Sequence, residues 1–233
     1  MTEGIVLHSR SGAPWGVSYE VAHTGHRMVV STPQASPELW ESYLEGALAV
    51  YGSHGVAPAL ELDRERTSLV FVALAPDGRP VGGMRAQGPY ERAEEAQALE
   101  VWDDDPEVHA RITDRLADGI VESKGLWVAR DVPGRRPVVQ AFGRAPVHAS
   151  TILGARYGLG TTAAHTERLW TSTGAVLQRD IPPVPYPDER YRTHLMFWDR
   201  WHLPPEVSDD EMRAVDAETA ALLRSTIPAP RAA

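Results

Sequence analysis

The stretch LVFVALAPDGRPVGGMRAQGP, residues 69–89, decides how this chain folds. It opens with LVFVALA, an almost continuous apolar run that is typical of a strand covered on both faces. Asp77 and Gly78 then give a tight-turn signal, and PVGGMRAQ follows as a return strand. The stretch therefore predicts a hairpin inside a sheet.

Two adjacent glycines stand in the return strand, where glycine normally weakens β-structure. Gly82 and Gly83 precede a single cation, Arg85. A glycine in a strand marks a bulge or the close approach of another group. One interpretation is that the glycines leave room beside a substrate channel, where Arg85 faces an acidic group. The other is that they accommodate a helix packed on the strand, with Arg85 paired to a surface acid.

Helices and strands alternate on both sides of this hairpin. Short β-prone runs within residues 5–30 predict one or two further hairpins, and the acidic segment 90–105 is expected to be a partly exposed connection. Pro146 should kink or split the longest helix. The predicted helices cover residues 37–52, 105–120, 138–157, 167–174 and 209–223, and the later strands cover residues 125–130, 161–166, 175–180 and 191–199.

This order of elements predicts an α/β fold with a mixed central sheet and flanking helices. The strand, long helix and strand within residues 125–166 should form a parallel, right-handed crossover. We expect a β-hairpin extension over residues 1–35, a core over residues 36–201, and a helix with a tail over residues 202–233.

The amino-acid composition excludes several classes of partner and of chemistry. The 233 residues are 42% hydrophobic and 24% charged, as in an ordinary globular protein, and the net charge is −9. Nucleic acid and anionic membrane surfaces are therefore not expected as partners, although a local basic pocket for phosphate is compatible with this charge. No signal peptide and no apolar run of about 20 residues is visible, so the cytoplasm is the expected location. The absence of cysteine excludes thiol catalysis and disulfides.

Nine histidines raise the question of a metal, but none of them forms an H-E-x-x-H motif, and no metal is expected. His165, at the end of a predicted strand, and His194, within another, are candidates for a general base because imidazole titrates near neutrality.

The order of elements resembles the GNAT acyltransferase fold. FVALAPDGRPVGGMR is similar to the second and third strands of that superfamily, GLWVAR to its fourth, and WTSTGAVLQRD with YRTHLMFWD to its closing element. Within the superfamily, the chain is most similar to acyl-homoserine-lactone synthases and long-chain N-acyl amino acid synthases. The positions that match are Glu61, Asp63, Arg85 and Glu122, with Lys124 shifted by one residue from the usual arginine.

The resemblance implies a site for the pyrophosphate of an acyl thioester, after the strand that contains Val128 and Arg130. A bulged strand and a helix N-terminus together favour an anion. The favoured loop is VPGRRP, and a second candidate is QAFGRA within the long helix. The residues of the two candidates are Gly134, Arg135 and Arg136 in the first, and Gln140 and Gly143 in the second.

The function implied is transfer of an acyl group from coenzyme A or acyl carrier protein to the amine of a small molecule, with direct attack by the amine. Glu122 is the preferred base or orienting residue, Arg85 would hold a carboxylate or phosphate, and His165 is the other catalytic candidate. The alternatives are a catalytically silent GNAT-like module that binds a ligand or protein, and a biosynthetic enzyme with different chemistry. A homodimer is left open.

Overall fold

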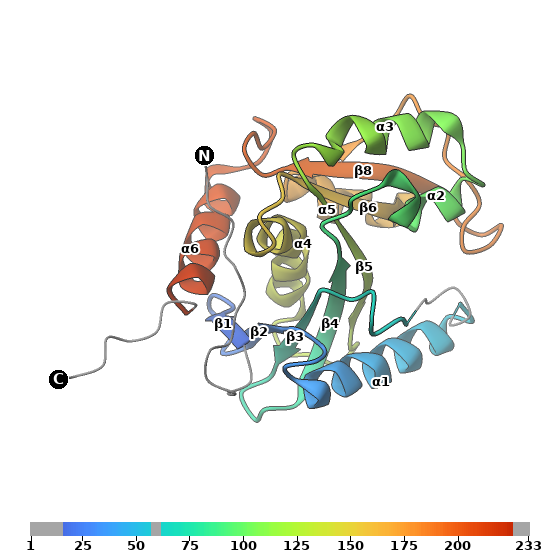
Figure 1. The fold of residues 1–233 in the computed structure, drawn as a ribbon. Helices are drawn as coiled ribbons and strands as arrows, with labels where there is room; N and C mark the ends of the chain where they lie inside the picture. The colour runs from blue at the N-terminus through green and yellow to red at the C-terminus, as the bar shows by residue number, and fades with distance from the viewer. Residues whose placement is uncertain (1–15, 57–61, 226–233) are drawn as a thin grey trace.

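The computed structural model describes residues 16–56 and 62–225 (Figure 1). The described strands form one eight-stranded sheet in the order β1-β2-β3-β4-β5-β6-β8-β7. The strands are β1 Gly16–Glu20, β2 Arg27–Ser31, β3 Leu69–Leu74, β4 Pro80–Gln87, β5 Ile120–Val128, β6 Tyr157–Ala163, β7 Val176–Leu177 and β8 Thr193–Asp199. The α-helices are α1 Pro37–Ser53, α2 Ala98–Val101, α3 Pro106–Leu116, α4 Arg135–Ile152, α5 Glu167–Ser172 and α6 Asp209–Ser225.

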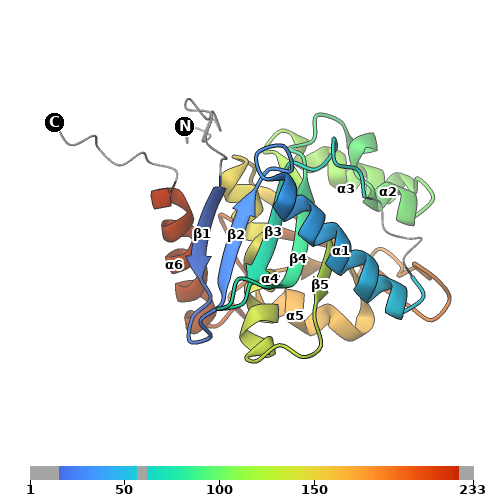
Figure 2. The ribbon, with the colours of Figure 1, turned by 90° about the horizontal axis from the view of Figure 1, so that it is seen from below.

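The sheet is mixed, as the sequence predicts. Strands β5 and β6 are parallel and are joined through helix α4, as predicted for the crossover. The other neighbouring pairs are antiparallel. Helix α1 lies across one face over β3, β4 and β5, and α4 packs on the opposite face (Figure 2). Helix α6 packs against β1 and α4 at the far edge of the sheet (Figure 1).

The two glycines of β4 are explained by packing. A Cβ at Gly82 would lie 2.7 Å from the ring of Phe142 in α4. A Cβ at Gly83 would lie 2.7 Å from Trp127 Nε1 and 2.8 Å from Tyr43 Cδ2 on the α1 face. Of the two interpretations, the accommodation of packed neighbours is therefore the one the structure supports. Arg85 is only 1% exposed, so it does not lie at the surface as this interpretation supposed.

The acidic segment 90–105 is not the partly exposed connection that its composition predicts. It contains a 3₁₀ turn at Ala93–Glu95 and helix α2, and it buries Leu99 and Trp102. These side chains join a second hydrophobic core with Ile112, Ile120 and Phe197. The charged side chains of this segment lie on its outer side, and the small, aliphatic and aromatic side chains between them pack inward. The acidic composition of the segment does not reveal this division.

Helix α4 begins three residues earlier than predicted and is continuous through Pro146, so the predicted kink or split does not occur. Nearly all of its residues from Ala141 to Ile152 are buried, and this packing holds the helix together where proline removes one backbone donor.

The last predicted strand, residues 191–199, is confirmed as β8. Phe197 packs in the second core and Trp198 in the main core on the other face, as alternation predicts. The α3 cap is also confirmed, because Asp105 Oδ1 accepts hydrogen bonds from the backbone N–H groups of Glu107 and Val108.

Candidate active site

A cleft opens where the two parallel strands of the sheet separate. Strands β5 and β6 pair only from Ile120 with Tyr157 to Glu122 with Leu159. Beyond these residues β5 stays with β4 and β6 stays with β8. The resulting cleft has a volume of about 730 Å³ and is lined by residues from both faces of the sheet.

A bulge in β5 lies at the same place. The pairing register between β4 and β5 shifts between Gly83 and Arg85, where Gly125 has φ 64°. Two tyrosines of α1 hold the bulged backbone: Tyr43 donates to the carbonyl of Gly125 at 3.3 Å, and Tyr51 to that of Leu126 at 3.2 Å. The bulged strand bends, as bulges do next to functional sites.

One end of the cleft meets the N-terminus of α4. Gly134 caps this helix in the left-handed conformation, φ 68°. Arg130 and Arg135 line the cleft, and Arg135 Nε donates to the carbonyl of Ala129 at 3.2 Å. Val128 lines it as well. Two guanidinium groups beside a helix N-terminus favour an anion.

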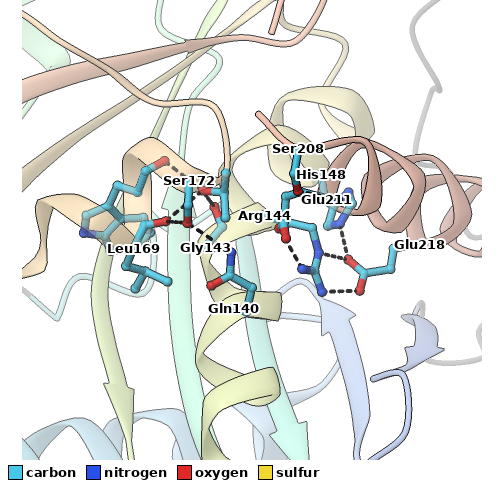
Figure 3. A network of polar contacts seen from close by, with 11 residues as sticks. Gln140, Gly143, Arg144, His148, Leu169, Ser172, Ser208, Glu211 and Glu218 are labelled. Carbon is cyan, nitrogen blue, oxygen red and sulfur yellow. Dashed lines mark hydrogen bonds and ion pairs between the residues drawn. The ribbon is translucent and has the colours of Figure 1, made fainter. Parts of the chain in front are cut away.

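The second phosphate candidate lies deeper in α4 and faces α5. Gln140 Nε2 donates to Ser172 Oγ at 3.1 Å, and a Cβ at Gly143 would lie 2.7 Å from the Thr173 methyl group (Figure 3). Neither residue is among those that line the cleft. Arg136 is exposed at the helix start but does not line it either.

Three charged residues lie together at the other end of the cleft, and we call them the floor cluster: Arg85, Glu122 and Lys124. Arg85 and Lys124 stand opposite each other in the register of β4 and β5. Nζ of Lys124 lies 3.6 Å from Oε1 of Glu122. Arg85 and Lys124 line the cleft, whereas the fully buried Glu122 lies behind them. The sequence-predicted pair Arg85 and Glu122 is thus placed in one region.

The carboxylate of Glu122 is held by the segment that was expected to be exposed. Its Oε2 accepts hydrogen bonds from the Tyr90 hydroxyl at 2.7 Å and from the Gln97 backbone N–H at 2.9 Å. Burial, and then the charge of Glu122, raise the pKa of Tyr90 well above its usual range, so Tyr90 stays a donor. Arg85 Nη2 donates to Gln97 Oε1 at 3.2 Å. No motif in the sequence pointed to Tyr90 or Gln97.

Aromatic and histidine side chains complete this end of the cleft. Tyr51, Tyr186 and Tyr191 line it, as do His54 and His165. Burial raises the pKa of Tyr51, so its hydroxyl stays neutral.

The two histidine candidates differ in position. His165 is exposed, in a turn after β6, with its ring centroid 6.1 Å from that of Tyr191. His194 Nε2 lies 3.2 Å from Glu167 Oε1, and His194 is not among the residues that line the cleft.

The two acidic positions that precede the central hairpin are not among the described residues that line the cleft. Asp63 closes a turn by accepting from the backbone N–H of Glu65, and Glu61 lies outside the described residues.

A second buried charge cluster joins α4 to α6 and was not anticipated from the sequence (Figure 3). Arg144 donates to both oxygens of Glu218 at 2.7 and 2.6 Å and to Glu211 Oε1 at 2.8 Å. His148 Nε2 lies 2.9 Å from Glu218 Oε2, and His148 Nδ1 lies 3.1 Å from Thr219 Oγ1. We call Arg144, His148, Glu211 and Glu218 the α4–α6 cluster.

The described residues contain neither a group of metal ligands nor a helix that could span a membrane. In residues 16–56 and 62–225, no three histidine or acidic side chains are grouped so that they could hold a metal ion. Within the same ranges, every helix is too short or too polar to span a bilayer.

Known proteins similar to this chain include two mycobacterial sequences. The uncharacterized protein Rv1356c of Mycobacterium tuberculosis (strain ATCC 25618 / H37Rv) is 38% identical over 205 residues, which is 85% of this chain and 78% of that protein. The uncharacterized protein Mb1391c of Mycobacterium bovis gives the same values. No protein-family model matches the chain.

Solved structures share the fold at low sequence identity. FeeM, an N-acyl amino acid synthase from uncultured soil microbes, has a TM-score of 0.57 and 8% identity, and the match covers 80% of this chain and 98% of FeeM. MesI, a CoA-dependent acyl-homoserine lactone synthase, has a TM-score of 0.54 and 16% identity over 80% of this chain and 94% of MesI. BjaI, another such synthase, has a TM-score of 0.52 and 13% identity over 92% of both chains. The fold predicted from the sequence resemblance is confirmed.

Proposed function

We propose an acyl-transfer function for this chain, which belongs to the family of the uncharacterized protein Rv1356c of Mycobacterium tuberculosis and has the fold of acyl-homoserine lactone synthases. The donor is acyl-CoA and the acceptor is the amine of a small molecule. The observation that carries the proposal is the cleft between β5 and β6, which joins the α4 N-terminus on one face of the sheet to the floor cluster on the other.

The α4 end suits the donor. Arg130 and Arg135 offer charge-assisted hydrogen bonds to the pyrophosphate, and the helix N-terminus adds its dipole. The pantetheine arm then runs between the separated strands. Leu169, Trp170 and Trp198 line the cleft and supply apolar surface for the acyl chain.

The floor end suits the acceptor. The amine nitrogen attacks the thioester carbonyl carbon, and the carbon–sulfur bond breaks to release the CoA thiol, which takes up the proton that the amine loses. No covalent enzyme intermediate is needed. Because Glu122 lies behind Lys124, its role is to position and balance the charge of the floor cluster, and the amine proton leaves through water or an imidazole of the cleft.

Calorimetric titration with CoA, acetyl-CoA and longer acyl-CoA, followed by detection of free thiol in the presence of an amine mixture, tests the proposal. We expect binding that strengthens with acyl length and thiol release that depends on an amine. Binding without release would favour the silent ligand-binding module, and the absence of binding to every thioester would refute both the donor and the reaction.

A further inference from the structure

Helix α1 provides hydrogen-bond donors for the backbone of β5 at the point where β6 leaves it. In the described sheet, the register of β5 with β6 ends at Glu122, and Gly125 and Leu126 have no register partner in β4 either. Their carbonyl groups accept hydrogen bonds from the hydroxyls of Tyr43 and Tyr51. The two hydroxyls thus satisfy backbone acceptors that strand pairing leaves open, and backbone groups away from water need such partners.

The packing of α1 on β5 brings both hydroxyls to the strand. Tyr43, Ala47 and Tyr51 follow one another at intervals of four residues and therefore share one face of the helix. A Cβ at Gly46 would lie 2.1 Å from the ring of Trp127, so the backbone of α1 rests directly on a side chain of β5. The glycine thus permits the close approach that puts the two tyrosines within reach of the bulge.

Both hydroxyls stay protonated and remain donors. Burial raises the pKa of Tyr43 to about 12, although Arg85 acts against this change through its charge and a hydrogen bond. Burial, and then the neighbouring Tyr43, raise the pKa of Tyr51 as well. Tyr43 is fully buried, whereas Tyr51 lines the cleft. Neither hydrogen bond is therefore lost near neutral pH.

These hydrogen bonds bear on the width of the cleft. Over residues 160–163, strand β6 is paired with β8, and its other edge faces the cleft. An edge with unpaired N–H and C=O groups is a template for a further strand. Strand β5 would gain hydrogen bonds if it continued along this edge, but two of its carbonyls are already taken by α1 and its bulge bends it away.

We infer that Tyr43 and Tyr51 are positioning residues for the acyl donor. Their hydroxyls hold β5 apart from β6 and so keep open the passage that the pantetheine arm takes between the two strands. This inference rests on the proposed acyl transfer. The nucleotide part of the donor, at the α4 N-terminus, lies outside the passage and does not depend on either hydroxyl.

A comparison of two ligands tests the inference. The double variant Tyr43→Phe and Tyr51→Phe keeps both rings and removes both hydroxyls. Calorimetry measures its dissociation constants for acyl-CoA and for 3′-phospho-ADP, which has the pyrophosphate of the donor but no pantetheine arm. We expect acyl-CoA to bind about tenfold more weakly than to the wild-type protein, because two hydrogen bonds that hold the passage are lost, and 3′-phospho-ADP to bind equally well.

Hydrogen–deuterium exchange gives a second readout that needs no ligand. In the double variant, the backbone amides of residues 124–128 should exchange about tenfold faster, while those of β3 keep their rates. The matched control is Tyr157→Phe. Tyr157 lies in β6 but does not line the cleft, and phenylalanine retains the ring that Arg115 and Arg156 contact. This control should match the wild-type protein in every measurement.

Three results would overturn the inference: unchanged acyl-CoA binding in the double variant, an equal loss for both ligands, or unchanged exchange at residues 124–128. An equal loss would make the tyrosines a general support of the fold. In each of these cases the wild-type protein still binds acyl-CoA, so the proposed function stands. If the wild-type protein binds no acyl-CoA, the proposed function fails, and the donor role of the tyrosines fails with it.

Discussion

The floor cluster and the α4–α6 cluster are both buried groups of charges, yet their surroundings differ. In the α4–α6 cluster, Arg144 and His148 saturate Glu218 between two packed helices (Figure 3). In the floor cluster, the two cations face a cavity of about 730 Å³. Buried charge alone is thus no sign of a functional site. What indicates a functional site is that charged side chains line a cavity, as Arg85 and Lys124 do.

The largest expected effect is on the free energy of unfolding, and it should distinguish the α4–α6 cluster from the floor cluster. Arg144→Leu leaves the buried Glu218 and the partly buried Glu211 without their guanidinium partner, and removal of one member of a buried ion pair costs roughly 3–5 kcal/mol. Urea unfolding measures the loss. As a control, Arg179→Ala removes a cation that is 69% exposed and paired with Glu167, and surface pairs contribute about 0–1 kcal/mol. Similar losses in the two variants would contradict the structural role of Arg144.

The next effect is on turnover. Glu122→Gln keeps the size and an acceptor oxygen for Tyr90 but removes the charge that balances Lys124. We expect thiol release to fall about 100-fold, because a floor cluster that has lost its balancing charge holds the acceptor out of place and a misplacement of about 1 Å can cost that much, with an unchanged fold by circular dichroism. Wild-type turnover in Glu122→Gln would make the floor cluster a scaffold like the α4–α6 cluster.

A smaller effect concerns donor binding at the α4 N-terminus. The double variant Arg135→Ala and Arg136→Ala should weaken acyl-CoA binding about tenfold, because charge-assisted contacts to phosphate are lost. Arg135 lines the cleft and Arg136 does not, so the single variant Arg135→Ala should account for most of the change. Gln140→Ala, in the middle of α4, serves as the control. An unaltered dissociation constant in the double variant would refute this phosphate site.

The smallest effect is a pH dependence of stability. Burial alone would raise the pKa of Glu218, but hydrogen bonds from His148 and Arg144 outweigh it and hold that pKa below its usual range. A carboxylate with a lowered pKa in the folded state stabilises the protein above the unfolded-state pKa and loses this contribution as the pH falls. Thermal unfolding should therefore shift to lower temperature as the pH falls below about 4.5.

The matched variant for this last measurement is Glu218→Gln, in which the acid-induced shift should be smaller. An equally steep shift in that variant would assign the acid sensitivity to other carboxylates.

Much of the fold was predictable because local signals agreed with it. Asp77 and Gly78 specify the central hairpin, Asp105 with Pro106 starts α3, and the aromatic run at 193–199 specifies β8. The kink at Pro146 and the exposed connection at 90–105 were mispredicted because burial overrode the signals of the proline and of the acidic residues. These errors come from contacts between segments distant in sequence.

The sequence by itself determined the order of strands and helices, the crossover from β5 to β6, and Arg135 at the start of the crossover helix, because turns, caps and periodicity act over a few residues. Arg85 and Glu122 were singled out by the resemblance to acyl-homoserine-lactone synthases. Only the tertiary structure decided what these residues face. The separation of β5 from β6 opens the cleft, Tyr90 and Gln97 hold Glu122 behind Lys124, and the pairing of Arg144 with Glu218 spans 74 positions. Such arrangements depend on which distant side chains share a buried volume, and that is set by packing of the whole chain.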